Sequence, residues 1–419
     1  MHAEWTSTSS NQTSNSAFFC FVAGCRYWLL ACVLVNLAAS LYLVSQKDEI
    51  TSWLLQEPLY MWGAVIATIM LLMWWLCRSL LITLITMLVC AVGMFSTLIV
   101  FSQLGMPLFS ALQIVLLAIA VSVTSAVHFS VSQTSLLIVS PSANILRSNL
   151  GSIVLVTIWT AALILLIGQF IGSSFAIASV AVIFFTQGLL LLLLLAFAPS
   201  FTPKEAGRDW LDKGLSKTIQ RILARPKLYS IGFIVVTLLM VGGLIMLTFT
   251  HDAMNSAPVS WPSLLFAGVL LCGLIKGQGK GFISSLMWIL LVLTMTLGAT
   301  LGSLAMAMMP FTAGLIGFAP VLIYLIVDAV IQILHPIKLS HQFSSSNTNK
   351  DRITEISKKF VSTSRSLVIS NTIVASAFSL LVMANHGDLL TFGLLIGTAI
   401  SWSIMSVLIL LPAIYLPVE

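Results

Sequence analysis

Residues 174–199 read SFAIASVAVIFFTQGLLLLLLLAFAP, and none of these 26 positions carries a charged side chain. A helix needs about 20 apolar residues to cross the hydrocarbon core of a bilayer, and this run exceeds that length. Within hydrocarbon every backbone N–H and C=O group must be paired by the protein, which favours a helix over a lone strand. The run therefore predicts a transmembrane helix.

The composition extends this prediction to the whole chain. Its 419 residues are 59% hydrophobic and 8% charged, whereas a soluble domain carries about 25% charged residues. A chain this apolar cannot hide its surface in one water-soluble core. We therefore expect an all-α, polytopic membrane protein.

Twelve apolar runs of this kind are found along the chain, six in each half. In the first half they lie near residues 27–45, 59–77, 79–102, 107–130, 150–171 and 174–199. In the second half they lie near residues 228–249, 260–275, 281–306, 311–335, 366–384 and 389–415. We predict twelve transmembrane helices, with no loop long enough for a sizeable soluble domain.

The distribution of basic residues tests this count and sets the orientation. Cytoplasmic loops carry an excess of Lys and Arg. With both termini in the cytoplasm, Lys47 is the only one of 19 Lys and Arg residues that falls outside. The cytoplasmic positions are then Arg26, Arg78, Arg147, the block Lys204–Lys227, Lys276, Lys280 and the block Lys338–Arg365. Because the net charge of +6 follows from this bias, it gives no reason to expect a nucleic-acid partner.

The two halves share an order of landmarks. Each has Met-Pro at the start of its fourth helix, Arg-Ser before its fifth and Pro at the end of its sixth, at 106–107 and 309–310, 147–148 and 365–366, and 199 and 412. Six crossings per half give both halves the same orientation, which predicts two parallel pseudo-repeats. The predicted organisation is a polar N-terminal segment, a first half, a linker helix and a second half, at 1–26, 27–200, 201–227 and 228–419.

Two cytoplasmic segments carry helical patterns of their own. The linker places apolar side chains on one stripe and basic side chains around it; the stripe is Leu211, Leu215, Ile219 and Ile222, and the basic residues are Lys213, Lys217 and Arg221. This pattern predicts a helix lying on the inner face of the membrane. Residues 349–365 predict a second cytoplasmic helix, which is either a solvated linker or a regulatory segment.

Asp328 is the acidic residue that lies deep within a predicted span. An ionised carboxylate there costs at least about 2.5–3.5 kcal/mol. One interpretation is a proton-binding switch or a polar substrate contact, and the other is a neutral acid hydrogen-bonded to a neighbouring helix. Ionisable residues within membranes are typically functional, which favours the first. Pro320, eight residues earlier, predicts a kink in this helix.

The first half has no acid at the corresponding place. Thr124 or Ser125 occupies it, and His128 follows one turn later. His128 is either a proton relay or a structural side chain at a helix end. Gln332, one turn after Asp328, is its counterpart in the second half.

The eleventh helix supplies further polar candidates. Asn371 and Thr372 either hydrogen-bond to Asp328 or hold neighbouring helices together. The six cysteines show no metal-ligand spacing, and the sequence has no nucleophile elbow, phosphate-binding loop or paired carboxylates. We therefore expect no metal, no cofactor and no enzymatic activity.

The residues around Asp328 resemble a motif of the resistance–nodulation–division (RND) superfamily. Residues 326–332, IVDAVIQ, are similar to the Gly-Val-Asp-x-x-Ile-His pattern of its fourth and tenth helices, and residues 123–128, VTSAVH, keep the His and lack the Asp. Residues 370–372, 392–395 and 411–413 resemble its later helices. The similarity is closest to the hydrophobe-exporter and MmpL-like permeases and covers about residues 26–416.

This resemblance implies a proton-motive-force-linked exporter of a lipid or other hydrophobic molecule in the inner membrane, with Asp328 as its switch. The loops at 46–58 and 250–259 are too short for the family's periplasmic porter domains, which implies a separate periplasmic carrier. The alternative is a non-transporting scaffold or lipid-sensing subunit of an envelope or biosynthetic complex. The oligomeric state is not indicated by any feature of the sequence.

Overall fold

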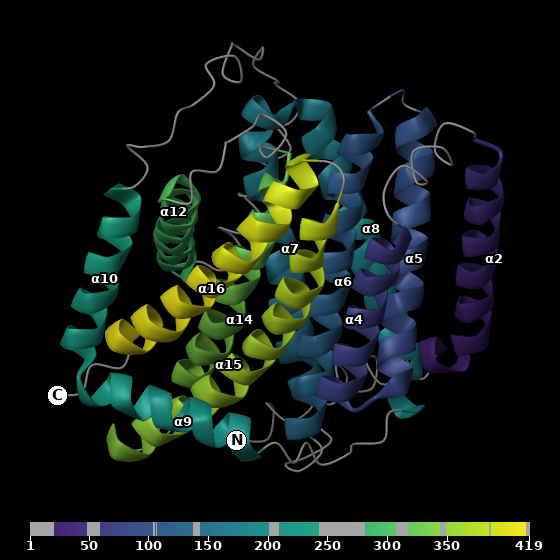
Figure 1. Cartoon of the computed structure of the whole chain (residues 1–419). Helices are drawn as coiled ribbons and strands as arrows, with labels where there is room; N and C mark the ends of the chain where they lie inside the picture. Colours follow the sequence, from purple (N-terminus) through teal and green to yellow (C-terminus); the bar gives the residue numbers. More distant parts are fainter. Residues whose placement is uncertain are drawn as a thin grey trace.

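The computed structural model describes most of the chain as a bundle of helices (Figure 1). The described residues are 21–47, 59–103, 105, 107–136, 143–200, 209–242, 281–306, 317–343, 349–384 and 387–415. Within these ranges there is no β-strand, so the expected all-helical membrane fold is confirmed. The short loops predicted at 46–58 and 250–259 lie almost wholly outside the described residues.

The helices follow the predicted apolar runs closely. They are α2 (Arg26–Ser45), α4 (Leu59–Cys77), α5 (Leu80–Gln103), α6 (Leu108–Leu136), α7 (Ala143–Ile171), α8 (Ser173–Phe197), α9 (Asp209–Ala224), α10 (Pro226–Gly242), α12 (Gly281–Met306), α14 (Ala319–Phe343), α15 (Asn349–Ser379) and α16 (Gly387–Tyr415). Short 3₁₀ turns, Ala198–Ser200 and Leu380–Met383, follow α8 and α15.

Among the described residues, nine helices are long and apolar enough to cross a membrane, or ten if the bent pair α9–α10 forms one span. Residues 319–334 of α14 form a further apolar helix that is shorter than this limit. The run predicted at 260–275 lies outside the described residues. A multi-pass membrane protein is therefore supported, while the count of twelve and the domain boundaries stay predictions.

Helix packing repeats between the two halves. In the first half α2 packs on α5, α5 on α6 and α8, and α7 on α8; in the second α10 packs on α12, α12 on α14 and α16, and α15 on α16. Across the halves α6 packs on α15, and α14 packs on α7. These equivalent contacts support two related halves that face each other through α6, α7, α14 and α15.

The helices α6 and α14 lie at the centre of this arrangement and contact each other directly. Of the apolar window of α6, 94% is buried within the protein, compared with 17% for the peripheral α2. In α14 every residue from Pro320 to Leu334 is buried. Polar side chains within residues 111–131 of α6 and 320–334 of α14 are therefore shielded from both water and lipid.

Three local expectations change in the structure. Pro320 is the second residue of α14, where the missing N–H has no helical acceptor to lose, so it starts the helix instead of kinking it. Residues 349–365 do not form a separate segment, because α15 continues through Ser379. The apolar stripe of the linker helix α9 packs on α15 and α16, so its main contact is protein and not lipid.

Candidate functional site

A cluster of buried polar side chains joins α6 and α14 at the interface between the halves. Asp328 of α14 is 1% exposed and His128 of α6 is 5% exposed. His128 Nε2 lies 3.0 Å from Asp328 Oδ2, so the two form an ion pair when the imidazole is protonated. This contact brings together two residues that are 200 positions apart in the sequence.

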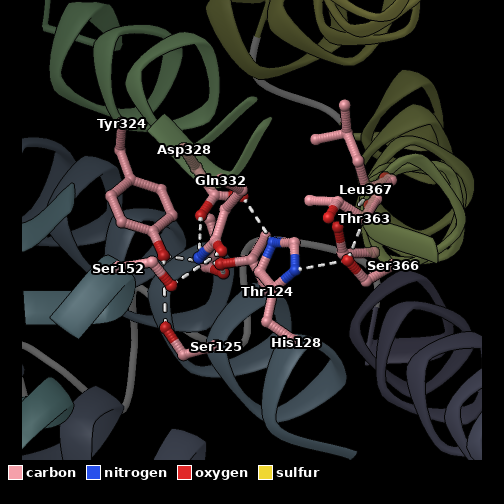
Figure 2. Close-up of polar contacts among 12 residues, drawn as sticks. Thr124, Ser125, His128, Ser152, Tyr324, Asp328, Gln332, Thr363, Ser366 and Leu367 are labelled. Atoms are coloured by element: carbon pink, nitrogen blue, oxygen red, sulfur yellow. Dashed lines mark hydrogen bonds and ion pairs between the residues drawn. The ribbon is translucent and has the colours of Figure 1, made fainter. Parts of the chain in front are cut away.

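Two polar arms extend from Asp328. In the first arm, His128 Nδ1 lies 2.9 Å from Ser366 Oγ on α15. In the second, Gln332 Nε2 donates to Asp328 Oδ1 at 3.3 Å, and Ser152 Oγ on α7 donates to Gln332 Oε1 at 3.0 Å. Figure 2 shows His128 between Asp328 and Ser366, with Gln332 and Ser152 on the other side of the carboxyl group. The cluster therefore connects four helices, two from each half.

The hydroxyl of Ser366 indicates which protonation state this geometry fits. Ser366 Oγ donates to the carbonyl of Thr363 at 2.8 Å. Because a hydroxyl has one proton to donate, His128 Nδ1 must then donate to Ser366. One further proton is needed between His128 Nε2 and Asp328 Oδ2. The arrangement thus fits the protonated pair, either imidazolium with carboxylate or neutral imidazole with carboxylic acid.

A second polar contact between α6 and α14 lies one turn earlier on each helix. The Tyr324 hydroxyl bonds to Thr124 Oγ1 and lies 3.4 Å from Ser125 Oγ. Ser125 also donates to Gln187 Oε1 on α8 at 3.0 Å. The predicted candidates Thr124 and Ser125 therefore belong to the buried interface, but they contact Tyr324 and not Asp328.

The candidates on α15 do not join this cluster. Asn371 is buried, and neither of its amide atoms has a hydrogen-bond partner among the described residues. Thr372 is exposed. The α15 side chain that reaches the site is instead Ser366.

An aromatic cluster lies between this site and one end of the bundle. Phe109 at the start of α6 meets Phe318 edge-on, with ring centroids 5.9 Å apart. Phe318 stacks on Phe392 of α16 at 4.1 Å, and Phe378 of α15 lies 6.1 Å from Phe392. Thr124 is 15 residues after Phe109 along α6, or about 22 Å at the helical rise. These rings give that end of the interface an apolar covering.

The sequence placed Asp328, His128 and Gln332 among the candidates but missed Ser366 and Ser152, which bond to them, and Tyr324, which bonds to Thr124. One feature of the sequence could have indicated Ser366: it belongs to the Arg-Ser pair before the eleventh helix. Tyr324 lies one turn before Asp328, and Ser152 lies one turn after the matching Arg-Ser pair. Among the described residues no group of three or more His, Cys, Asp or Glu side chains could hold a metal ion.

Comparison with known proteins identifies the fold. No protein-family model and no curated protein matches the sequence. Among solved structures, the chain is similar to SecDF from Thermus thermophilus, described as a translocon-associated membrane protein, with a TM-score of 0.61. SecDF is an RND-superfamily protein. This chain shares its helical membrane fold with SecDF.

The coverage and the sequence identity of this match limit what can be concluded from it. The match covers 84% of this chain and 60% of SecDF, at 11% sequence identity. The chain thus spans about three fifths of the length of SecDF, and the likeness concerns the fold alone. The fold agrees with the one that the RND resemblance implies, whereas the closer similarity to MmpL-like permeases remains a prediction.

Proposed function

We propose that this chain is a proton-coupled membrane transporter in which the His128–Asp328 pair binds and releases the coupling proton. The observation that carries the proposal is the buried contact between these two titratable side chains, 3.0 Å apart, one from each half. Ionisable residues inside membranes commonly mark proton relays, and here both partners can change protonation state.

Proton release changes the charge at the interface between the halves. The protonated pair is neutral overall, and the deprotonated pair carries one negative charge. A net charge buried without compensation is costly, so loss of the proton favours an arrangement in which water or a cation reaches the site. A transporter alternates when such a change biases the packing of one half against the other.

Ser366 gives the two states different hydrogen bonds. In the protonated pair Ser366 donates to Thr363 and accepts from His128 Nδ1. In the deprotonated pair the single imidazole proton lies on Nε2, facing the carboxylate, and Ser366 turns its hydroxyl toward Nδ1. Proton release thus alters a bond within α15 as well as the contact between α6 and α14.

The proposed cargo is a lipid or another hydrophobic molecule, moved out of the inner membrane with the help of a periplasmic carrier. The support is the resemblance of residues 326–332 to the motif of hydrophobe exporters, together with the RND-like fold. Both termini are proposed to be cytoplasmic. In Figure 1 the described start of α2 and the end of α16 lie toward the same end of the bundle as α9, which agrees with this arrangement.

A second candidate function is assistance to a protein translocon. The observation that favours it is the structural similarity to SecDF, which is itself translocon-associated. The same proton-binding pair would serve either cargo. A purely structural scaffold or lipid-sensing subunit is less favoured, because neither role requires a buried pair of titratable groups.

The test uses purified protein in liposomes that contain a pH-sensitive dye. A proton gradient is imposed, candidate lipids are added, and the wild type is compared with Asp328→Asn. Lipid-dependent proton flux that the variant lacks supports a proton-coupled lipid transporter. Flux that requires a co-reconstituted translocon, and not lipid, favours the second candidate. Equal flux in wild type and variant contradicts the role of the pair.

A further inference from the structure

The linker helix α9 has two faces with different partners. Leu215, Ile219 and Ile222 are buried, between 1% and 8% exposed, and α9 packs on α15 and α16. The apolar stripe that a membrane-surface helix would place in lipid is therefore occupied by protein. What α9 leaves exposed is its polar face.

The exposed face carries a row of basic side chains. Lys213, Lys217 and Arg221 are exposed at intervals of four residues, and Arg225 continues the row just after α9 ends. Lys213, Lys217 and Arg221 each lie two positions from a buried apolar residue, which is about 200° around the helix. Lys213, Lys217 and Arg221 thus point away from the buried stripe, and Arg225 is exposed just beyond the helix; these four residues are the basic row.

The acidic residues of α9, Asp209 and Asp212, lie at its start, before the row. The sequence from 213 to 227 contains no Asp or Glu. Among the described residues, none forms a salt bridge with the basic row. The row spans about 18 Å at the helical rise, which places four positive charges along a narrow strip.

The bend between α9 and α10 indicates where the basic row lies relative to the hydrocarbon core of the membrane. The two helix axes differ in direction by 94°, and Figure 1 shows α9 lying across the lower end of the bundle beside the upright α10. Leu228 and Ile231 in the first turns of α10 are each 61% exposed, as expected of side chains in contact with lipid. Lys227, next to Leu228, is exposed and charged. The hydrocarbon boundary therefore falls close to the bend, and α9 lies at headgroup level.

We infer that the basic row on α9 binds the anionic headgroups of phospholipids in the leaflet beside it. Each Lys or Arg held near an anionic membrane surface contributes about fivefold to the affinity. A row of four at headgroup level therefore favours an anionic lipid over a zwitterionic one. This inference does not depend on proton coupling by His128 and Asp328.

The binding test is native mass spectrometry of the full chain in detergent, titrated separately with phosphatidylglycerol and phosphatidylcholine. The wild type is expected to bind phosphatidylglycerol at least about tenfold more tightly, given the contribution of each basic residue. The variant K213Q/K217Q/R221Q/R225Q is expected to bring the ratio of the two affinities close to one. The matched control K213R/K217R keeps the charges and is expected to keep the preference.

Three outcomes would overturn the inference: no preference in the wild type, an unchanged preference in the four-fold glutamine variant, or displacement of phosphatidylglycerol by an equal concentration of inorganic phosphate. The last would assign the row to a soluble anion. Circular dichroism checks the fold of each variant. If the four-fold variant does not fold, K213Q/K217Q compared with K213R/K217R gives the same test with a smaller expected change.

Discussion

The two arms that meet at Asp328 have the same construction but different chemistry. One arm runs from Asp328 through His128 of α6 to Ser366 of α15, and the other runs through Gln332 of α14 to Ser152 of α7. Each arm has a nitrogen-bearing side chain in the middle and a serine at its end. The first arm contains an imidazole, which can bind a second proton, and the second contains an amide, which cannot.

This difference indicates a division of roles within one pseudo-symmetric frame. Gln332 donates to Asp328 Oδ1, and because its amide does not change protonation state, we expect it to hold the carboxyl group in a fixed orientation. The histidine arm meets Oδ2, where the proton is shared. We therefore assign proton exchange to the histidine arm and positioning to the glutamine arm.

The largest effect is expected from Asp328→Asn, which removes the acid that both arms share. The amide keeps an oxygen that can accept from Gln332 but cannot bind the coupling proton. Proton flux in liposomes should fall at least about a hundredfold, the lower end of what a positioned proton-transferring group contributes. Size-exclusion chromatography should show a folded protein. Flux within a factor of about two of the wild type would rule out Asp328 as the switch.

Replacing Asp328 with Ala separates folding from coupling. Alanine leaves His128 and Gln332 without the carboxyl group that they contact, and breaking a buried pair in this way costs about 3–5 kcal/mol. Thermal unfolding in detergent should therefore occur at a clearly lower temperature for Asp328→Ala than for Asp328→Asn. If both variants unfold at the wild-type temperature, the carboxyl group does not stabilise the interface.

The next largest effect is expected from His128→Gln, which makes the two arms alike. Asp328 remains, but the partner that shares its proton is lost, so flux should fall by less than in Asp328→Asn. The exchange variant H128Q/Q332H moves the imidazole to the other side of the carboxyl group. It should recover part of the flux lost in His128→Gln, measured in the same liposomes. Full activity in His128→Gln would show that the arms do not differ in function.

The serines at the ends of the arms provide a smaller, matched comparison. Hydrogen bonds of this kind within membranes contribute about 0.6 kcal/mol on average, so Ser366→Ala and Ser152→Ala should lower stability similarly and slightly. Proton flux should fall in Ser366→Ala, because Ser366 responds to the protonation of His128, and should change less in Ser152→Ala. A larger loss of flux in Ser152→Ala would reverse the roles assigned to the arms.

The smallest effect on flux is expected from Tyr324→Phe. This variant removes the hydrogen bonds to Thr124 and Ser125 one turn from Asp328 but no titrating contact. It should lower stability by about 0.6 kcal/mol and leave proton flux near the wild-type value. A loss of flux as large as in His128→Gln would instead place Tyr324 on the proton path.

Hydropathy and charge made the fold predictable, because an apolar run and a basic loop are local features of the sequence. Most predicted runs became helices with nearly the expected ends. The kink expected at Pro320 is replaced by a helix start, because the proline is the second residue of α14. The residues before it are also apolar, so hydropathy does not show where the helix begins. The apolar stripe of α9 predicted a helix, but the sequence did not show that α15 and α16 cover this stripe.

The site was only partly predictable. Asp328 is conspicuous because an acid is costly in an apolar run. Its contact with His128 joins residues 200 positions apart and depends on how the halves pack, which periodicity does not show. Asn371 and Thr372 could not both face Asp328, because adjacent residues of a helix point about 100° apart.

The central claim, that His128 and Asp328 bind one exchangeable proton, is tested most directly by infrared spectroscopy of the protein in vesicles. Spectra would be compared across the pH range in which carboxyl and imidazole groups titrate, for the wild type, Asp328→Asn and His128→Gln. The account predicts carboxyl and imidazole bands that change with pH in the wild type, with the carboxyl change absent in Asp328→Asn and shifted in His128→Gln. Identical pH-dependent changes in all three proteins would contradict it.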